Sequence, residues 1–256
     1  MTRRRERVRQ IGSRAVQIGF VLGLLLLWYL ATNDWGVNHL LLPNPLAVWH
    51  QFVDLLGSGA YLPDLRVTAI EFAVAFLLAM VGGTVTGYFV SRSQFLIRVF
   101  EPLLAGIYSI PIILLLPLYV LFFGLGLASK IALGATISFF PITLATIAGF
   151  GGVDATLVKA ARAMGASNYQ MFRYVLLPAA LPVVLGGLRI GFTVALLSIL
   201  GSETIASLSG LGHQIVSLAE DMEMSRTFAY IAFVVIIVAL LNSFVSYLEA
   251  RGRRHR

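Results

Sequence analysis

The sequence contains no cysteine, which excludes disulfide bonds, thiolate catalysis and metal sites with cysteine ligands. Charged residues are also scarce, at 12% of the 256 residues, whereas hydrophobic residues make up 58%. An ordinary soluble domain is about 25% charged, so a globule of this composition lacks the polar residues to cover its surface in water. The composition predicts a membrane protein rather than a soluble enzyme, a disulfide-rich secreted protein or a disordered regulator.

Motifs for catalysis and cofactor binding are missing as well. The four histidines are scattered without the spacing of metal ligands. Neither of the two lysines follows a glycine, as the lysine of a phosphate-binding loop does. No H-E-x-x-H or G-x-S-x-G motif is present. We therefore expect no catalytic residue, no metal site and no cofactor bound by this chain, and an intramembrane enzyme is disfavoured.

Six apolar stretches approach the ~20 residues that a helix needs to cross a bilayer. They lie at about 16–32, 67–90, 103–123, 131–150, 181–202 and 228–248. None shows the alternating pattern of a β-barrel strand, so the predicted fold is all-α and polytopic, with about six transmembrane helices. The first stretch has a basic flank like that of a signal peptide, but it lacks a convincing cleavage site and is expected to be retained.

The distribution of basic residues predicts the orientation. With the N-terminus inside, the cytoplasmic segments hold fifteen of the 19 Lys and Arg residues, and Arg189 lies within the fifth stretch. The outer connections hold the remaining three, Arg66, Lys130 and Arg226. This excess of positive charge predicts that both termini, 1–15 and 251–256, are cytoplasmic. A nucleic-acid-binding tail is disfavoured because no aromatic residues interleave with the basic ones.

Two predicted connections are longer than a turn. In the outer one, 33–66, Leu42-Pro43-Asn44-Pro45 is followed by an apolar pattern over 46–56 that predicts a short interfacial helix.

The inner connection, 151–180, predicts two short helices. Asp154 is expected to cap the first helix and Gly165 to end it in a left-handed conformation. A second helix would begin at 167 or 168, and Pro178 would separate it from the next span. Several apolar side chains in this loop suggest that a partner protein covers it, although packing against the chain's own helices is an alternative.

The inner connection resembles the loop motif of ATP-binding cassette (ABC) importer permeases, which reads Glu-Ala-Ala, three residues, Gly, nine residues, Ile, one residue, Leu-Pro. The corresponding residues here are Lys159, Ala160, Ala161, Gly165, Val175, Leu177 and Pro178. Lys159 stands where the family usually has Glu, and Val175 replaces Ile conservatively.

Further motifs resemble the nitrate/sulfonate/taurine-type permeases of this family. They are Leu42-Pro43-Asn44-Pro45, Ser109-Ile110-Pro111, Leu116-Pro117-Leu118, Phe123-Gly124-Leu125-Gly126, Phe139-Phe140-Pro141, Gly201-Ser202-Glu203 and Gly210-Leu211-Gly212. The resemblance covers roughly residues 40–250. It implies the type I ABC importer permease fold, with its core at 67–250, in a bacterial-type inner membrane.

The resemblance also implies partners. Two ABC ATPase subunits would use ATP and Mg, an extracytoplasmic substrate-binding protein would deliver the cargo, and a second permease copy would most simply make a homodimer, with a heterodimer left open. Nine residues are expected to couple the chain to the ATPase: Lys159, Ala160, Ala161, Met164, Gly165, Ala166, Ser167, Leu177 and Pro178. The cargo stays open among sulfonates, taurine, nitrate, bicarbonate and vitamin precursors.

Candidate pathway residues are Arg189, Glu203, Pro111 and Pro117. Arg189 lies about eight residues, or ~12 Å, into the fifth stretch, where it could contact an anion or reach back to the membrane surface. Glu203 is expected to form hydrogen bonds or to gate the pathway. Pro111 and Pro117, together with Pro141, are expected to break the helices that carry them.

Two further expectations concern the spans, and one concerns the function. Glu71 is expected at the membrane boundary. Glycines four residues apart, Gly83 with Gly87 and Gly187 with Gly191, predict close helix packing. An ion-gradient-driven secondary transporter acting alone is the alternative function. Such proteins often carry inverted repeats and intramembrane carboxylates, neither of which is apparent in the sequence.

Overall fold

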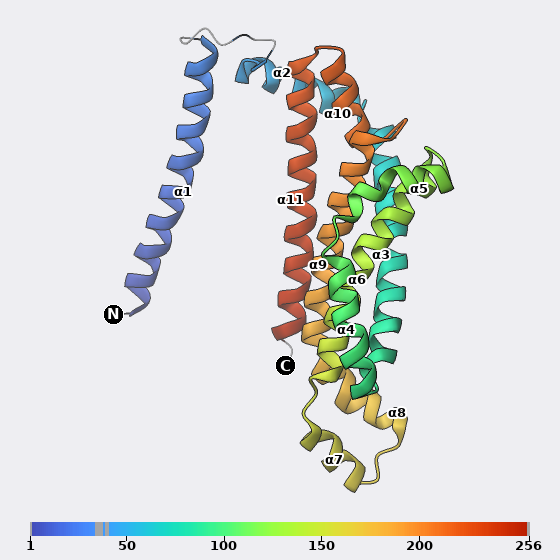
Figure 1. Ribbon diagram of the computed structural model, residues 1–256. Helices are drawn as coiled ribbons and strands as arrows, with labels where there is room; N and C mark the ends of the chain where they lie inside the picture. Colours follow the sequence, from blue (N-terminus) through green and yellow to red (C-terminus); the bar gives the residue numbers. More distant parts are fainter. Residues whose placement is uncertain (1, 34–37, 39–40, 255–256) are drawn as a thin grey trace. The chain divides into compact units, whose positions relative to one another are not determined.

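The computed structural model describes residues 2–33, 38 and 41–254, and the side chains of 16, 17, 19–33, 38 and 41–247. Regular structure in these residues is entirely helical, as predicted (Figure 1). The elements in chain order are α1 (Thr2–Asn33), α2 (Pro45–Ser58), α3 (Leu62–Ser91), α4 (Gln94–Tyr108), the 3-10 helix η1 (Ile112–Leu115), α5 (Leu116–Phe123), α6 (Leu127–Gly151), α7 (Ala155–Ala163), α8 (Asn168–Met171), the π-helix η2 (Phe172–Leu176), α9 (Leu177–Ile205), α10 (Leu211–Glu220) and α11 (Met224–Arg254).

The long helices confirm a polytopic membrane protein. Within the part of the chain that the structure describes, four helical segments are long and apolar enough to cross a membrane: 62–91, 127–151, 168–205 and 224–247. The third predicted stretch is a broken span, because α4 and the η1–α5 segment pass the same test together but are bent by 71°. In the first predicted stretch, the described apolar helix is the shorter Gly19–Asn33.

The chain forms two compact units, residues 1–61 with 215–234 and residues 62–214 with 235–256. In the first unit, the indole N–H of Trp28 donates to the carbonyl oxygen of Pro43 at 3.0 Å, and the Trp28 ring lies 6.0 Å from that of Phe228. Asn44 caps α2, since its side-chain oxygen accepts from the Leu46 N–H at 2.9 Å. The helix predicted near 46–56 is therefore present.

In the second unit, α3 and α6 pack closely and in parallel (Figure 1). A methyl group added at Gly83 would lie 3.0 Å from the side chain of Ile142, and one added at Gly87 would lie 2.6 Å from that of Thr146. A step of four residues along α3 therefore moves the contact four residues forward along α6. Both glycines are buried, which confirms the packing that their spacing predicts.

Helix α9 packs on α6 in the opposite direction. A methyl group at Gly187 would overlap Ala145, and one at Gly191 would lie 2.5 Å from Ile142. A step of four residues forward along α9 thus moves the contact backward along α6. The second predicted glycine pair is confirmed as a packing site, and α6 is the central helix of the unit.

The parallel arrangement of α3 and α6 explains the broken span. Because both helices start at the same end of the unit, the chain must return to that end between them, and α4, η1 and α5 make this return. The break follows α4, where Pro111 precedes η1. Pro117 lies in the first turn of α5, which tolerates proline, and Pro141 lies inside α6, which continues past it. Of the three prolines predicted to interrupt the hydrogen-bond ladder, Pro111 alone lies at the break in the span, and Pro141 removes one ladder donor from a helix that continues.

Candidate functional site

The inner connection forms two short helices with local caps. The Asp154 carboxylate accepts the backbone N–H of Thr156 at 2.7 Å and caps α7. This hydrogen bond stabilises the charged carboxylate and lowers the pKa of Asp154 below its ordinary value. Gly165 follows α7 with φ of 79°, the left-handed conformation expected for it, and Ser167 caps α8 in a capping box with Gln170.

The predicted coupling loop, residues 151–180, is attached to the ends of the long helices by contacts between aromatic rings. Ala161 on α7 and Met171 on α8 are buried. The ring of Phe172 lies 5.3 Å from that of Tyr88, at the end of α3, and 6.1 Å from that of Phe150, at the end of α6. The loop is therefore packed against the ends of α3 and α6.

The opposite side of the coupling loop is exposed and partly apolar. Met164 is 81% exposed, and Leu157, Tyr169 and Tyr174 are also exposed. Among the nine predicted coupling residues, Ala161 is buried, and Ala166, Leu177 and Pro178 are half-buried. The other exposed members are Lys159, Ala160, Gly165 and Ser167. A monomer leaves such apolar side chains in water only at a cost, which is the usual mark of an interaction surface.

The loop passes into the next span without a break. The helical segment runs from Asn168 to Ile205 and includes the π-helix η2. Pro178 lies in the first turn of α9, where its missing N–H costs little. The prediction that Pro178 separates the loop from the span is therefore wrong, and the two are mechanically continuous.

Two charged residues are buried where the sequence analysis expected a boundary and a loop. The Lys130 ammonium lies 2.9 Å from the Glu71 carboxylate, and both side chains are at most 2% exposed. The parallel packing of α3 and α6 brings Glu71 to face Lys130 in the core of the second unit. Lys130 is not in an outer connection, because α6 begins at Leu127.

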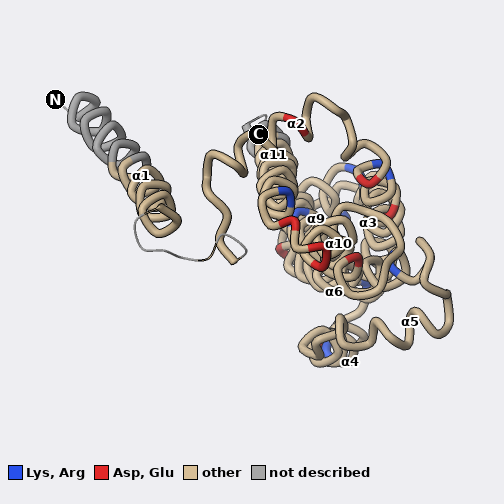
Figure 2. Tube along the Cα trace, turned by 90° about the horizontal axis from the view of Figure 1, so that it is seen from above, with Lys and Arg blue, Asp and Glu red and all other residues tan. Residues whose placement is uncertain are grey.

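Glu203 belongs to the same buried region, near the end of α9. One carboxylate oxygen accepts the Thr68 hydroxyl at 2.6 Å, and the other accepts the backbone N–H of Gly212 at 2.8 Å. Lys130 donates to the hydroxyl of Ser207 at 2.7 Å. The segment 206–211 is thus held on the ends of α3, α6 and α9. Figure 2 shows the acidic and basic positions along the chain in a view from above.

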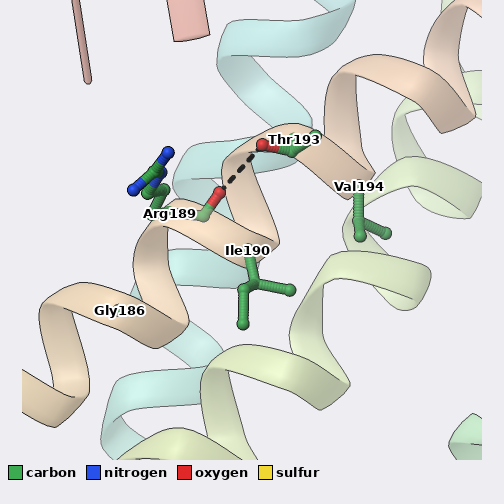
Figure 3. Close-up of a pocket in the computed structure, with 5 residues that line it drawn as sticks. All are labelled: Gly186, Arg189, Ile190, Thr193 and Val194. Atoms are coloured by element: carbon green, nitrogen blue, oxygen red, sulfur yellow. Dashed lines mark hydrogen bonds between the residues drawn. The ribbon is translucent and has the colours of Figure 1, made fainter. Parts of the chain in front are cut away.

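Arg189 is exposed twelve residues, or ~18 Å, along α9. It lines a pocket of about 410 Å³ with Gly186, Ile190, Thr193 and Val194. Figure 3 shows the Thr193 hydroxyl directed back to the carbonyl oxygen of Arg189, at 3.1 Å. Arg189 lies within α9 and Glu203 lies near its end, so the predicted pathway residues do not form one cluster. Pro111 and Pro117 lie on other elements.

The sequence analysis missed the buried cluster of Glu71, Lys130 and Thr68. The buried residues of α3 include Glu71, Ala75 and Ala79, which follow one another at four-residue spacing. This spacing in the sequence could have indicated that Glu71 lies on the packed face of the helix. Nothing local could have identified Lys130 as its partner, because the pairing depends on how two distant helices align.

Comparisons with known proteins give a consistent picture. The profile of the family described as "Binding-protein-dependent transport system inner membrane component" matches residues 71–254. The chain is 31% identical to the putative aliphatic sulfonates transport permease protein SsuC of Bacillus subtilis (strain 168), over 91% of this chain and 87% of that protein. It is 30% identical to the taurine transport system permease protein TauC of Escherichia coli (strain K12), over 92% of this chain and 88% of that protein.

Solved structures with the same fold are also known. A chain in the crystal structure of an amino acid ABC transporter with histidines superposes with a TM-score of 0.63 at 20% identity, over 80% of this chain and 98% of that chain. A chain of the MetNI methionine ABC transporter in an inward-facing conformation gives a TM-score of 0.61 at 22% identity, over 74% of this chain and 93% of that chain.

Proposed function

Because the chain belongs to the family of binding-protein-dependent transport system inner membrane components and is a permease subunit of an ABC importer, we propose that it carries a small organic anion inward with ATP hydrolysed by a separate subunit. The observation that carries the proposal is the coupling loop: an exposed, partly apolar surface built on local caps and joined rigidly to the long helices.

The exposed side of the coupling loop would bind the ATPase. Met164 stands next to Gly165, whose left-handed conformation turns the chain between α7 and α8. Lys159 is exposed on α7, so this chain presents a positive charge where the family usually has a negative one. We expect the facing residue of its ATPase to be acidic or neutral.

Movement of the ATPase would reach the spans through ring contacts and through one continuous helical segment. The rings of Phe172, Tyr88 and Phe150 join the loop to α3 and α6, and the helical segment 168–205 joins it to α9. Close packing at Gly187 and Gly191 leaves little room for α9 to slide along α6. A pull on the loop would therefore tilt the three helices as one body, which is a route to alternating access.

The cargo is proposed to be a small anion that carries a sulfonate or a similar group. SsuC and TauC are named for aliphatic sulfonates and taurine. An exposed arginine in the middle of a span is costly in lipid, so it is expected to face a wet pathway or another subunit. Arg189 and the pocket beside it would provide a cationic contact for such an anion.

The assembly and its orientation follow from the family and from the charges. Two ATPase subunits, a second permease copy and an extracytoplasmic binding protein would complete the importer. Both termini and the coupling loop would be cytoplasmic. The excess of Lys and Arg in the segments predicted to be cytoplasmic supports this orientation.

The coupling loop is tested with two matched variants, Met164→Glu and Leu208→Glu. The two side chains are 81% and 75% exposed, but Leu208 lies beyond the other end of α9. A charge at Met164 should abolish ATPase co-purification and ATP-driven uptake, because it would be desolvated in an apolar contact. Leu208→Glu should retain ATPase co-purification. Equal ATPase binding by both variants, or uptake driven by an ion gradient without ATPase, would contradict the proposal.

The cargo class is tested by uptake into proteoliposomes that hold the complete importer. Taurine and an alkanesulfonate are the anionic probes, and riboflavin is the neutral one. Arg189→Gln should lower uptake of the anions at matched expression, and Leu197→Ile, exposed on α9 but outside the pocket, should not. Saturable uptake of riboflavin alone would show that the anion assignment is wrong while leaving the coupling loop assignment intact.

A further inference from the structure

The carboxyl groups of Glu71 and Glu203 share one buried site that the proposed transport cycle does not use. Glu71 is fully buried, and Glu203 and Lys130 are each 1% exposed. Thr68, three residues before Glu71 on α3, donates to Glu203. The Glu203 carboxyl group therefore lies against the face of α3 that carries Glu71, near enough for the two carboxyl groups to interact.

The charges of this site do not balance without a further proton. Lys130, from α6, is its cation and lies 2.9 Å from Glu71. The Asp64 carboxylate, on α3, accepts the backbone N–H of Gly210 at 3.0 Å and brings no positive charge to the site. One ammonium group compensates one carboxylate, which leaves a second buried carboxylate. A buried charge without a counter-ion is costly and ordinarily becomes neutral.

Hydrogen bonding indicates where the missing proton lies. Apart from the ion pair with Lys130, no donor among the described residues reaches either carboxylate oxygen of Glu71. Glu203 is the neighbouring carboxyl group on this face of α3, and protonation would give it the donor that Glu71 lacks. Glu71 is the ionised member because it faces the ammonium group. We propose that Glu203 binds a proton and donates it to Glu71, making a buried proton site that holds the segment 206–211 closed on the bundle.

The segment 206–211 lies directly on this site. Gly210 has φ of 108°, and a methyl group there would overlap the Glu203 carboxyl group. The N–H groups of Leu211 and Gly212 donate to the Thr68 hydroxyl and to Glu203, at 2.9 and 2.8 Å. Loss of the proton would place two carboxylates near each other, and their repulsion would loosen the segment.

Infrared spectroscopy detects the proton directly. The full chain in lipid nanodiscs at neutral pH should show the carbonyl stretch of a protonated carboxylic acid. Glu203→Gln should remove the band. Glu101→Gln, at an exposed position on α4, should keep it. A folded chain without a band that depends on Glu203 would overturn the proposal.

Cysteine labelling follows the closed segment without altering Glu203. Since the chain has no cysteine, Leu211→Cys and Leu208→Cys each introduce a single thiol, the first buried and the second exposed. The ratio of their maleimide rates cancels the common effect of pH. We expect it to rise by up to about tenfold per pH unit as Glu203 loses its proton, and to stay flat when Glu203→Gln is added. If the ratio of labelling rates does not change with pH in the chain that keeps Glu203, the proton site is refuted. This conclusion would hold whatever the outcome of the ATPase and uptake experiments.

Discussion

Replacing Lys130 by Met tests the buried ion pair at the centre of the second unit. Methionine keeps most of the volume of lysine and removes its charge. The Glu71 carboxylate must then stay charged without its ammonium partner, or take up a proton. The hydrogen bond from Lys130 to Ser207 is lost as well. We expect the variant to insert in the membrane and to be markedly less stable than the wild type.

The magnitude follows from burial. Both side chains are at most 2% exposed, so water screens the 2.9 Å contact very little. Removing one partner of such a pair costs about 3–5 kcal/mol, because the other charge stays buried. Adding Glu71→Gln removes that charge and keeps an acceptor oxygen, so the double variant should recover on the order of 2 kcal/mol of the loss.

The assay is a denaturant titration of each purified variant in the same mixed micelles. Arg226→Met is the matched control, because Arg226 lies 2.7 Å from Glu223 but the two side chains are 57% and 44% exposed. An exposed pair is worth at most about 1 kcal/mol, so this variant should unfold near the wild-type midpoint. The reasoning is refuted if Lys130→Met costs no more than Arg226→Met, or if Glu71→Gln fails to recover stability.

Two further predictions concern packing and pH. Gly191→Ala should destabilise the protein by about 1–3 kcal/mol, because its methyl group would lie 2.5 Å from Ile142. Gly186→Ala on the same helix is the control, because a methyl group there meets nothing within 4 Å. The unfolding midpoints of the two variants should therefore differ, with only Gly191→Ala lowered. The Asp154 cap stabilises α7 fully above the ordinary Asp pKa and is lost as the pH falls through its lowered pKa. Hydrogen exchange of 155–163 should therefore rise at acid pH relative to Asp154→Asn, and equal protection in both chains would contradict the capping role.

The coupling loop was predictable from sequence because its signals are local. Asp154, Gly165 and Ser167 each act on residues within three or four positions, so a sequence pattern contains both partners of every contact. The π-helix that joins the loop to α9 was not predictable, because its residues carry no distinct pattern. Proline was also misleading at Pro178, since the same residue can end a helix or begin one.

The buried pair could not be predicted because it depends on alignment between distant helices. Apolar length located α3 and α6, and small residues indicated that they pack. Neither pattern says that Glu71 and Lys130 lie at the same level of the two helices, or that Glu71 faces Lys130 and not solvent. The helix α10 was also missed, because ten residues of mixed polarity resemble a loop. What the sequence left open was pairing between elements rather than the elements themselves.

The glycine contact on α9 lies close to the middle of a single long rod. Gly187 is nineteen residues from Asn168 and eighteen from Ile205, so two arms of roughly 28 Å extend from it. When α3, α6 and α9 tilt as one body about the level of this contact, the two ends of α9 move in opposite directions. The end of α9 near Met164 and the end near Glu203 would therefore never open together. This coupling follows from the rigidity of the helix and needs no separate conformational change between its ends.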